Sequence, residues 1–194
     1  MELIYPYDMA PVLPAPTAES SMSVRTDTEY FPVVEPNGLV YARSARDYCH
    51  SGAKPLHPVV HLHVIDRFSR IYLQKRPMTK KIQPGKWDTA VGGHVSYGEQ
   101  LLEALYREAY EELRFYEFNP IHILTYEFES EVEKELVNVY AAVGSFKLSP
   151  DPEELDGGRW WELQEIDAAI GKGILTPNFE SEFKMIRQSL LALL

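Results

Sequence analysis

The residues best suited to chemistry are five glutamates within fourteen positions, opposed by the single cation Arg107. They are Glu99, Glu103, Glu108, Glu111 and Glu112. On a helix, Glu108 lies one turn from Glu112 and three residues from Glu111, so these three carboxylates crowd one side. Carboxylate oxygens are the ligands that Mg²⁺ and Mn²⁺ prefer, and the pattern therefore indicates a site for divalent cations.

This crowding is unfavourable in the absence of a cation. Like charges one turn apart on a helix cost about 0.2–0.5 kcal/mol per pair. Glu111 and Glu112 also fall in the last turn, where the helix dipole prefers cations, at a further cost of about 0.3–1 kcal/mol each. Acidic helix faces are usually solvated surfaces, so the identification of a site depends on the residues at fixed distances around the glutamates.

The segment from Gly93 to Phe115 resembles the signature of the Nudix hydrolase family. That signature is glycine, five residues, glutamate, seven residues, Arg-Glu, an aliphatic residue, any residue, Glu-Glu, any residue, glycine and an aliphatic residue. The matching positions are Gly93, Glu99, Arg107, Glu108, Glu111 and Glu112, with Ala109 and Phe115 in the apolar places. Arg114 departs from the pattern, because the family has a glycine there that can close the helix with a left-handed backbone.

The resemblance implies a metal-dependent hydrolase that cleaves a diphosphate linkage in a nucleoside diphosphate-type or other organic diphosphate. Water attack on such a linkage needs neutralised oxyanion charge and an activated nucleophile, which bound Mg²⁺, or Mn²⁺, supplies. The implied metal ligands are Glu108, Glu111, Glu112, the carbonyl of Gly93 and, in an outer position, Glu99. The implied catalytic residues are Glu108, Glu111, Glu112, Arg107 as an orienting partner, and Glu154 as a candidate general base. The expected substrate-binding residues are Arg76, Trp87, Gly92 and Gly93.

The stretch from Leu56 to Val95 also resembles isopentenyl diphosphate isomerase, a relative that shares the fold. His57 and His94 match histidines that bind metal in that enzyme. The isomerase needs a catalytic cysteine just before the Gly-His pair, where this chain has Gly92, and Cys49 lies in another segment. We therefore favour the hydrolase and keep an isomerase-like enzyme as the alternative.

Two further interpretations stay open at this point. The chain could be a catalytically inactive regulatory domain that binds a nucleotide or sugar ligand, although such domains in this family usually have lost their glutamates. His61 and His63 alternate along an expected strand, so both imidazoles share one face. They are either structural, hydrogen-bonded histidines or a metal pair.

The elements that position these residues follow from the spacing of apolar and turn-forming residues. A hairpin is expected around Pro36-Asn37-Gly38, because Asn-Gly supplies the positive φ angles of a tight turn. On the helix predicted at residues 100–113, the apolar stripe consists of Leu101, Leu102, Leu105 and Ala109. The other predicted strands are residues 58–66, 71–76, 121–127, 136–146 and 158–161. A short helix is predicted at residues 162–169. A terminal amphipathic helix is predicted from Pro177, and its apolar face consists of Phe179, Phe183, Ile186, Leu190 and Leu193.

Together these elements predict an α/β protein, a Nudix-type α/β/α sandwich with a mixed central sheet and an N-terminal β-hairpin. We expect a proline-rich N-terminal arm at residues 1–28 and a single Nudix domain at residues 29–194. The arm contains Pro6, Pro11, Pro14 and Pro16, which exclude regular structure.

The composition limits the classes of partner. A formal net charge of −10 argues against broad contact with a nucleic acid, which needs clustered Lys and Arg. No apolar run is long enough to span a bilayer, and the N-terminus lacks the pattern of a secretory signal. The single cysteine, Cys49, fits a reducing compartment, so we expect a cytoplasmic protein. By its resemblance to a family whose members commonly dimerise, the chain is expected to bind a small-molecule diphosphate and a homodimer is a further expectation.

Overall fold

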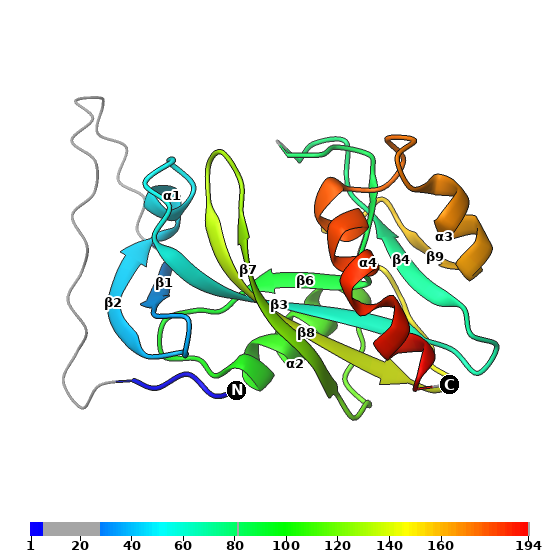
Figure 1. The fold of residues 1–194 in the computed structure, drawn as a ribbon, viewed down its shortest axis with the longest axis horizontal. Helices are drawn as coiled ribbons and strands as arrows, with labels where there is room; N and C mark the ends of the chain where they lie inside the picture. Colours follow the sequence, from blue (N-terminus) through cyan, green and yellow to red (C-terminus); the bar gives the residue numbers. More distant parts are fainter. Residues whose placement is uncertain (6–27, 81, 194) are drawn as a thin grey trace. The chain divides into compact units, whose positions relative to one another are not determined.

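The computed structural model describes residues 1–5, 28–80 and 82–193, and these residues form nine strands and four helices (Figure 1). In chain order the elements are β1 (Tyr30–Val34), β2 (Val40–Ala45), α1 (Arg46–Cys49), β3 (Leu56–Ile65), β4 (Ile71–Lys75), β5 (Trp87–Asp88), β6 (Val91–His94), α2 (Leu101–Leu113), β7 (Ile121–Glu129), β8 (Lys134–Val143), β9 (Gly158–Trp161), α3 (Leu163–Ala169) and α4 (Pro177–Leu191).

The chain separates into two compact units. The first consists of Met1–Val60, Gly93–Ala104 and Thr125–Asn138, and the second of His61–Gly92, Leu105–Leu124 and Val139–Leu194. The main sheet has the strand order β5-β4-β3-β8-β7, with β6 paired to β3 and β9 paired to β4. The predicted α/β architecture with a mixed central sheet and an N-terminal hairpin is confirmed.

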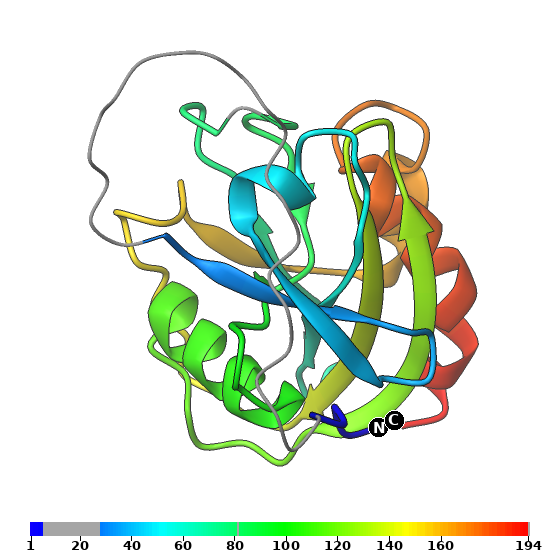
Figure 2. The same ribbon diagram turned by 90° about the vertical axis from the view of Figure 1, so that its left-hand side faces the viewer.

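In the first unit, β1 and β2 form the expected antiparallel hairpin, which faces the viewer in Figure 2. Its turn places Gly38 at φ +86°, and the side chain of Asn37 accepts a hydrogen bond from the Leu39 N–H at 3.0 Å. Phe31 and Val33 are buried on the inner face of the hairpin. The short helix α1, which the sequence analysis did not anticipate, follows β2 directly and ends at Cys49.

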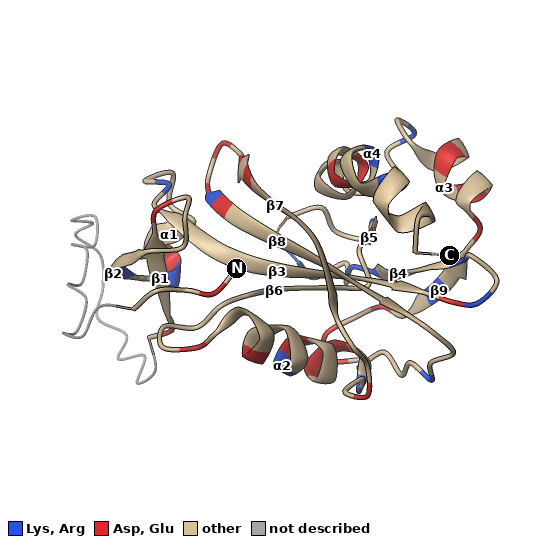
Figure 3. Cartoon of the chain, turned by 60° about the horizontal axis from the view of Figure 1, so that its bottom comes forward, with Lys and Arg blue, Asp and Glu red and all other residues tan. Residues whose placement is uncertain are grey.

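In the second unit, β4 lies between β5 and β9, and Ile71 pairs with Trp161. Helix α4 begins at the N-cap Thr176, whose hydroxyl accepts the Phe179 N–H, and Pro177 occupies its first turn, where the missing N–H costs nothing. Figure 3 shows α4 on one face of β3 and β4 and the C-terminal part of α2 on the other face.

Two details of the predicted apolar faces are wrong. Leu102 is 46% exposed, and Ala104 is buried in its place, because the inward face of α2 follows positions 101, 104, 105 and 109. On α4 the residues Phe179, Phe183, Ile186 and Leu190 are buried as predicted. Leu193 lies beyond the end of that helix and is only partly buried.

The predicted N-terminal arm lies mostly outside the described residues, since residues 6–27 are among those left out. Its first five residues are described. Leu3 is buried, Ile4 forms a parallel bridge with Leu39, and the Tyr5 hydroxyl donates to the carbonyl of Glu99 at 2.9 Å. Among the described residues, no helix combines the length and the apolar character needed to cross a membrane.

Candidate active site and metal-binding clusters

Two glutamates hold the start of α2, Glu99 just before the helix and Glu103 in its first turn. The Glu99 carboxylate accepts the backbone N–H of Ser96 at 3.0 Å, and the Glu103 carboxylate accepts that of Gln100 at 2.7 Å. Unsatisfied N–H groups and the positive end of the helix dipole both favour carboxylates here. In this arrangement Glu99 supports the loop before the helix.

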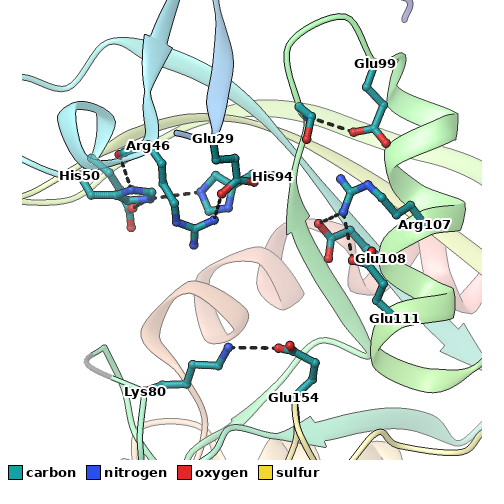
Figure 4. A network of polar contacts seen from close by, with 12 residues as sticks. Glu29, Arg46, His50, Lys80, His94, Glu99, Arg107, Glu108, Glu111 and Glu154 are labelled. Carbon is teal, nitrogen blue, oxygen red and sulfur yellow. Dashed lines mark hydrogen bonds and ion pairs between the residues drawn. The ribbon is translucent and has the colours of Figure 1, made fainter. Parts of the chain in front are cut away.

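Further along α2, Arg107 connects two of the carboxylates expected to bind metal (Figure 4). Its Nη1 atom donates to Glu108 at 2.7 Å and to Glu111 at 3.2 Å. The guanidinium therefore fixes the orientation of both side chains and offsets part of their mutual repulsion. In Figure 3, α2 accordingly shows acidic residues in red on both sides of a basic residue in blue.

Glu112 is a strongly perturbed carboxylate. Its Oε2 atom accepts the Gly92 N–H at 3.2 Å, and the Gln74 amide lies 3.4 Å away. Burial, with Glu108 as the next contribution, raises the pKa of Glu112 to about 8. A bound cation favours the charged form of such a carboxylate, and carboxylate oxygens are the ligands of a hard divalent ion. Among the described residues, Glu108, Glu111 and Glu112 do not form a group whose ligand atoms all lie within 4.8 Å of one another, so their role as metal ligands stays a prediction.

Arg114 occupies the place of the family's glycine and adopts the same left-handed backbone, with φ +52°. Its N–H donates to the carbonyl of Tyr110 at 3.0 Å, which closes the helix. The side chain lies over the Tyr110 ring, 5.1 Å from its centroid, and forms an ion pair with Asp151. The backbone of Asp151 in turn donates to the carbonyl of Glu112 at 2.9 Å, so α2 ends in a well-bonded turn despite the missing glycine.

A second group of possible metal ligands lies in the first unit. His50, His57 and His94 offer ring nitrogens within 4.8 Å of one another, and a ring nitrogen of His94 lies within the same distance of carboxylate oxygens of Glu133 and Glu135. The Nε2 atoms of His50 and His94 are 3.2 Å apart, as Figure 4 shows, and Glu133 lies 3.1 Å from His50. We call these five residues the histidine cluster.

His57 is the member whose chemistry points most directly to a metal. Its Nδ1 lies 2.9 Å from the carbonyl of Pro55, so that nitrogen carries the proton, and its buried Nε2 has no hydrogen-bond partner. Burial lowers the pKa of His57 to about 4, which keeps the ring neutral. A neutral imidazole held by a backbone carbonyl and presenting its other nitrogen is the usual form of a metal-binding histidine.

The sequence analysis identified only two members of this cluster, His57 and His94. It missed His50, Glu133 and Glu135. The only available signal was the alternation of Glu133, just before β8, and Glu135, within it, which favours both side chains on one face. His50 follows α1, a helix that was itself not predicted.

The residues expected to bind substrate have other contacts. Arg76 donates to the carbonyl of Ile82 at 3.1 Å and lies 3.5 Å from the carboxylate of Asp88. Trp87 packs edge-on against Trp161, with ring centroids 5.2 Å apart. Both residues thus belong to the structure around β5, while Gly92 contributes its N–H to Glu112.

Glu154, the candidate general base, forms an exposed ion pair with Lys80 at 3.4 Å (Figure 4). Both side chains are about half exposed, at 49% and 48%. Such a pair contributes little to stability, and neither group is held in a desolvated environment. Cys49 is buried, and burial raises its thiol pKa to about 11, which suits an unreactive thiol.

Comparison with known proteins assigns the family. The model of the Nudix domain matches residues 55–179. An uncharacterised Nudix hydrolase of Yersinia pestis is 30% identical over 140 residues, which cover 72% of this chain and 76% of that protein. An isopentenyl-diphosphate Delta-isomerase of Clavibacter sepedonicus is 26% identical over 150 residues, covering 74% of this chain and 78% of the relative.

A solved structure shows the same fold. The crystal structure of a Deinococcus radiodurans protein matches with a TM-score of 0.70 at 21% identity, over 81% of this chain and 99% of that one. The sequence match spans the glutamates of α2 and two histidines of the cluster, His57 and His94. On this combined sequence and fold similarity, the chain belongs to the Nudix family.

Proposed function

We propose that this protein is a metal-dependent hydrolase that cleaves the diphosphate linkage of a nucleoside diphosphate-type or other organic diphosphate. The observation that carries the proposal is the desolvated carboxylate of Glu112, which lies near Glu108 and accepts the Gly92 N–H. Two carboxylates placed close together near the end of a helix do not stabilise the helix by themselves, whereas a site for a divalent cation requires such neighbouring carboxylates.

In this proposal Glu108, Glu111 and Glu112 hold Mg²⁺ or Mn²⁺, with the carbonyl of Gly93 and an outer Glu99 as further ligands. The bound cation neutralises charge on the diphosphate and makes a nucleophilic water available near neutral pH. Arg107 keeps Glu108 and Glu111 in fixed orientations through its two hydrogen bonds. Gly92 donates to Glu112 and so helps to fix the orientation of that side chain.

The histidine cluster supports a second metal centre in the same protein. Its donor set of imidazole nitrogens and carboxylate oxygens suits Mn²⁺ or another transition metal better than Mg²⁺. The unpartnered, buried Nε2 of His57 is the observation that favours it. The resemblance of His57 and His94 to metal-binding histidines of the isomerase supports this second centre.

An isomerase remains the second candidate because of that cluster. The protein has glycine at position 92, where the isomerase signature requires a reactive thiol, and the thiol of Cys49 is buried with a raised pKa. The hydrolase is therefore the better-supported activity. A purely regulatory domain ranks below both, since the glutamates of the family signature are all present.

The experiment is a panel of nucleoside and non-nucleoside diphosphates incubated with the full chain and Mg²⁺ or Mn²⁺. We expect phosphate-containing products from at least one class, no activity after chelation, and a loss of about 10²-fold or more in Glu112→Gln. Glu117→Gln, at an exposed glutamate five residues further on, is the matched control and keeps wild-type turnover. Full activity of Glu112→Gln or of the chelated protein would contradict the proposal.

A further inference from the structure

A buried glutamine of the second unit contacts the glutamate site and has no role in the proposed function so far. Gln74 lies on β4 and is only 4% exposed. A buried amide costs free energy unless it is hydrogen-bonded. Its Nε2 atom lies 3.4 Å from Oε2 and 3.5 Å from Oε1 of Glu112. Within the part of the chain that the structure describes, Glu112 is the one side chain that this amide contacts.

The strands on either side of β4 offer this amide no competing partner. On β9, Gln74 pairs with Gly158, which has no side chain. On β5 it pairs with Asp88, whose carboxylate has other partners. One Asp88 oxygen accepts the Thr176 hydroxyl at 3.0 Å, and the other lies 3.5 Å from Arg76. The amide is therefore left to the last turn of α2.

The two carboxylate oxygens of Glu112 have different surroundings. Oε2 accepts the Gly92 N–H at 3.2 Å and faces the Gln74 amide at 3.4 Å. Oε1 has only the longer contact with Gln74, at 3.5 Å, among the described residues. Each carboxylate oxygen offers about two lone pairs, so Oε1 keeps a lone pair for a cation. The side chain extends from α2, and donors on β4 and β6 determine how its carboxylate is turned.

The partner of Glu112 differs in charge from the partner of the other two proposed ligands. Glu108 and Glu111 accept hydrogen bonds from Arg107 at 2.7 and 3.2 Å, so a cationic side chain already offsets part of their charge. The Gln74 amide carries no net charge. It can orient Glu112 and still leave the negative charge of that carboxylate to a bound cation.

We propose that Gln74 is a positioning residue of the cation site, whose amide orients Glu112 so that one oxygen stays with Gly92 and the other is presented to the cation. This inference rests on the proposed function. Residues that hold metal ligands in place typically contribute about 10- to 100-fold to metal affinity. Gln74 acts through Glu112 and needs no contact with the substrate.

The test is Gln74→Met, which removes the hydrogen-bond donor and keeps an unbranched side chain of similar length. We expect the Mg²⁺ concentration that half-maximally stabilises the protein against thermal unfolding to rise about 10- to 100-fold. The Mg²⁺ concentration for half-maximal activity should rise by the same factor. At saturating Mg²⁺, kcat and the KM of the diphosphate should stay close to the wild-type values, because the defect lies in holding the cation.

Asn138→Leu is the matched control for the loss of a buried amide. Asn138 is fully buried in the first unit, and its Nδ2 atom donates to the carbonyls of Val59 at 3.3 Å and Leu136 at 3.0 Å. We expect this variant to lose stability without a change in its Mg²⁺ dependence. A glutamine with only a structural role at position 74 would give the same result.

Thermal unfolding without Mg²⁺ reports whether each variant folds, and Gln74→Leu replaces Gln74→Met if the latter does not. The inference alone would be overturned if wild-type hydrolysis requires Mg²⁺ and Glu112 while Gln74→Met and Gln74→Leu keep the wild-type Mg²⁺ dependence. A wild-type protein that hydrolyses no diphosphate would overturn the proposed function, and the inference would fall with it.

Discussion

At the scale of single residues, Arg114 shows how one substitution in a signature is accommodated. The left-handed backbone at φ +52° costs a residue with a side chain about 1–2 kcal/mol relative to glycine. The ion pair with Asp151 and the contact with the Tyr110 ring offset part of this cost. The residue that breaks the sequence pattern thus preserves the backbone geometry that the pattern encodes.

Two substitutions separate these contributions. Arg114→Ala removes the side-chain contacts and retains the backbone strain, whereas Arg114→Gly removes both. We expect Arg114→Gly to be more stable than Arg114→Ala by about 1 kcal/mol, the difference in backbone cost. Urea denaturation of both variants measures this difference. Equal stabilities, or a more stable alanine variant, would show that position 114 carries no strain.

Glu182 makes a second residue-scale prediction, about pH. Its two oxygens contact His61 Nδ1 and His63 Nε2, each at 2.7 Å, and these imidazoles outweigh its burial. Its folded pKa lies below the ordinary value of 4.5, so its contribution to stability is present above that pH and is lost as the pH falls through the folded pKa. The stability advantage of the wild type over Glu182→Gln should therefore shrink on acidification below about pH 4.5. Denaturation of both proteins between pH 3 and 7 gives the curve, and a constant difference would contradict this assignment of charge.

At the scale of elements, the helix predicted at residues 100–113 is found as α2. Glu108, Glu111 and Glu112 lie on this one helix, so local spacing was enough to group them, and their role as metal ligands stays a prediction. Its inward face was less accurate, since exposed Leu102 and buried Ala104 differ from the periodic pattern. Hydrophobicity alone did not distinguish these two positions, because burial of a small residue depends on what packs against it.

The histidine cluster could not be assembled in this way. Its members come from the end of α1, from β3, from β6, from the β7–β8 turn and from β8, and the fold brings them together. The carbonyl of Pro55 that fixes the His57 tautomer is likewise visible only in the structure. The contacts of Glu182 with His61 and His63 could not be predicted from the sequence either, because Glu182 lies 119 residues beyond His63.

Helix α2 should gain stability from a divalent cation. The proposed ion relieves the repulsion among its carboxylates, so Mg²⁺ at about 100 times its dissociation constant should stabilise the fold by about 2.7 kcal/mol. Thermal denaturation with and without Mg²⁺ measures the effect, and Glu108→Gln should reduce it while Glu117→Gln should not. An equal shift in both variants would indicate that the cation binds elsewhere.

At the scale of the whole molecule, the two groups of ligands predict two kinds of metal site. His57→Asn should remove one equivalent of bound Mn²⁺ without removing the Mg²⁺ effect of the glutamate site. His122→Asn, at an exposed histidine of β7, is the matched control. Titration of each variant with Mn²⁺ gives the stoichiometry. Unchanged Mn²⁺ binding in His57→Asn would exclude the histidine cluster as a centre.

The family and the α/β architecture could be predicted for the whole molecule because a single continuous signature encodes both. The matched family domain covers residues 55–179, so it excludes the β1–β2 hairpin and α1. Substrate identity could not be predicted, because Arg76 and Trp87 have structural partners in Asp88 and Trp161. Residue type alone does not distinguish a substrate contact from a packing contact.

The central claim, that water cleaves a diphosphate at this site, is tested most directly by isotope labelling. The full chain is incubated with Mg²⁺ and the best diphosphate of the panel in ¹⁸O-labelled water, and the products are analysed by mass spectrometry. The hydrolase account predicts one ¹⁸O atom in one of the two phosphate products, and no such product from Glu112→Gln. An intact, rearranged diphosphate without ¹⁸O would contradict it and favour the isomerase.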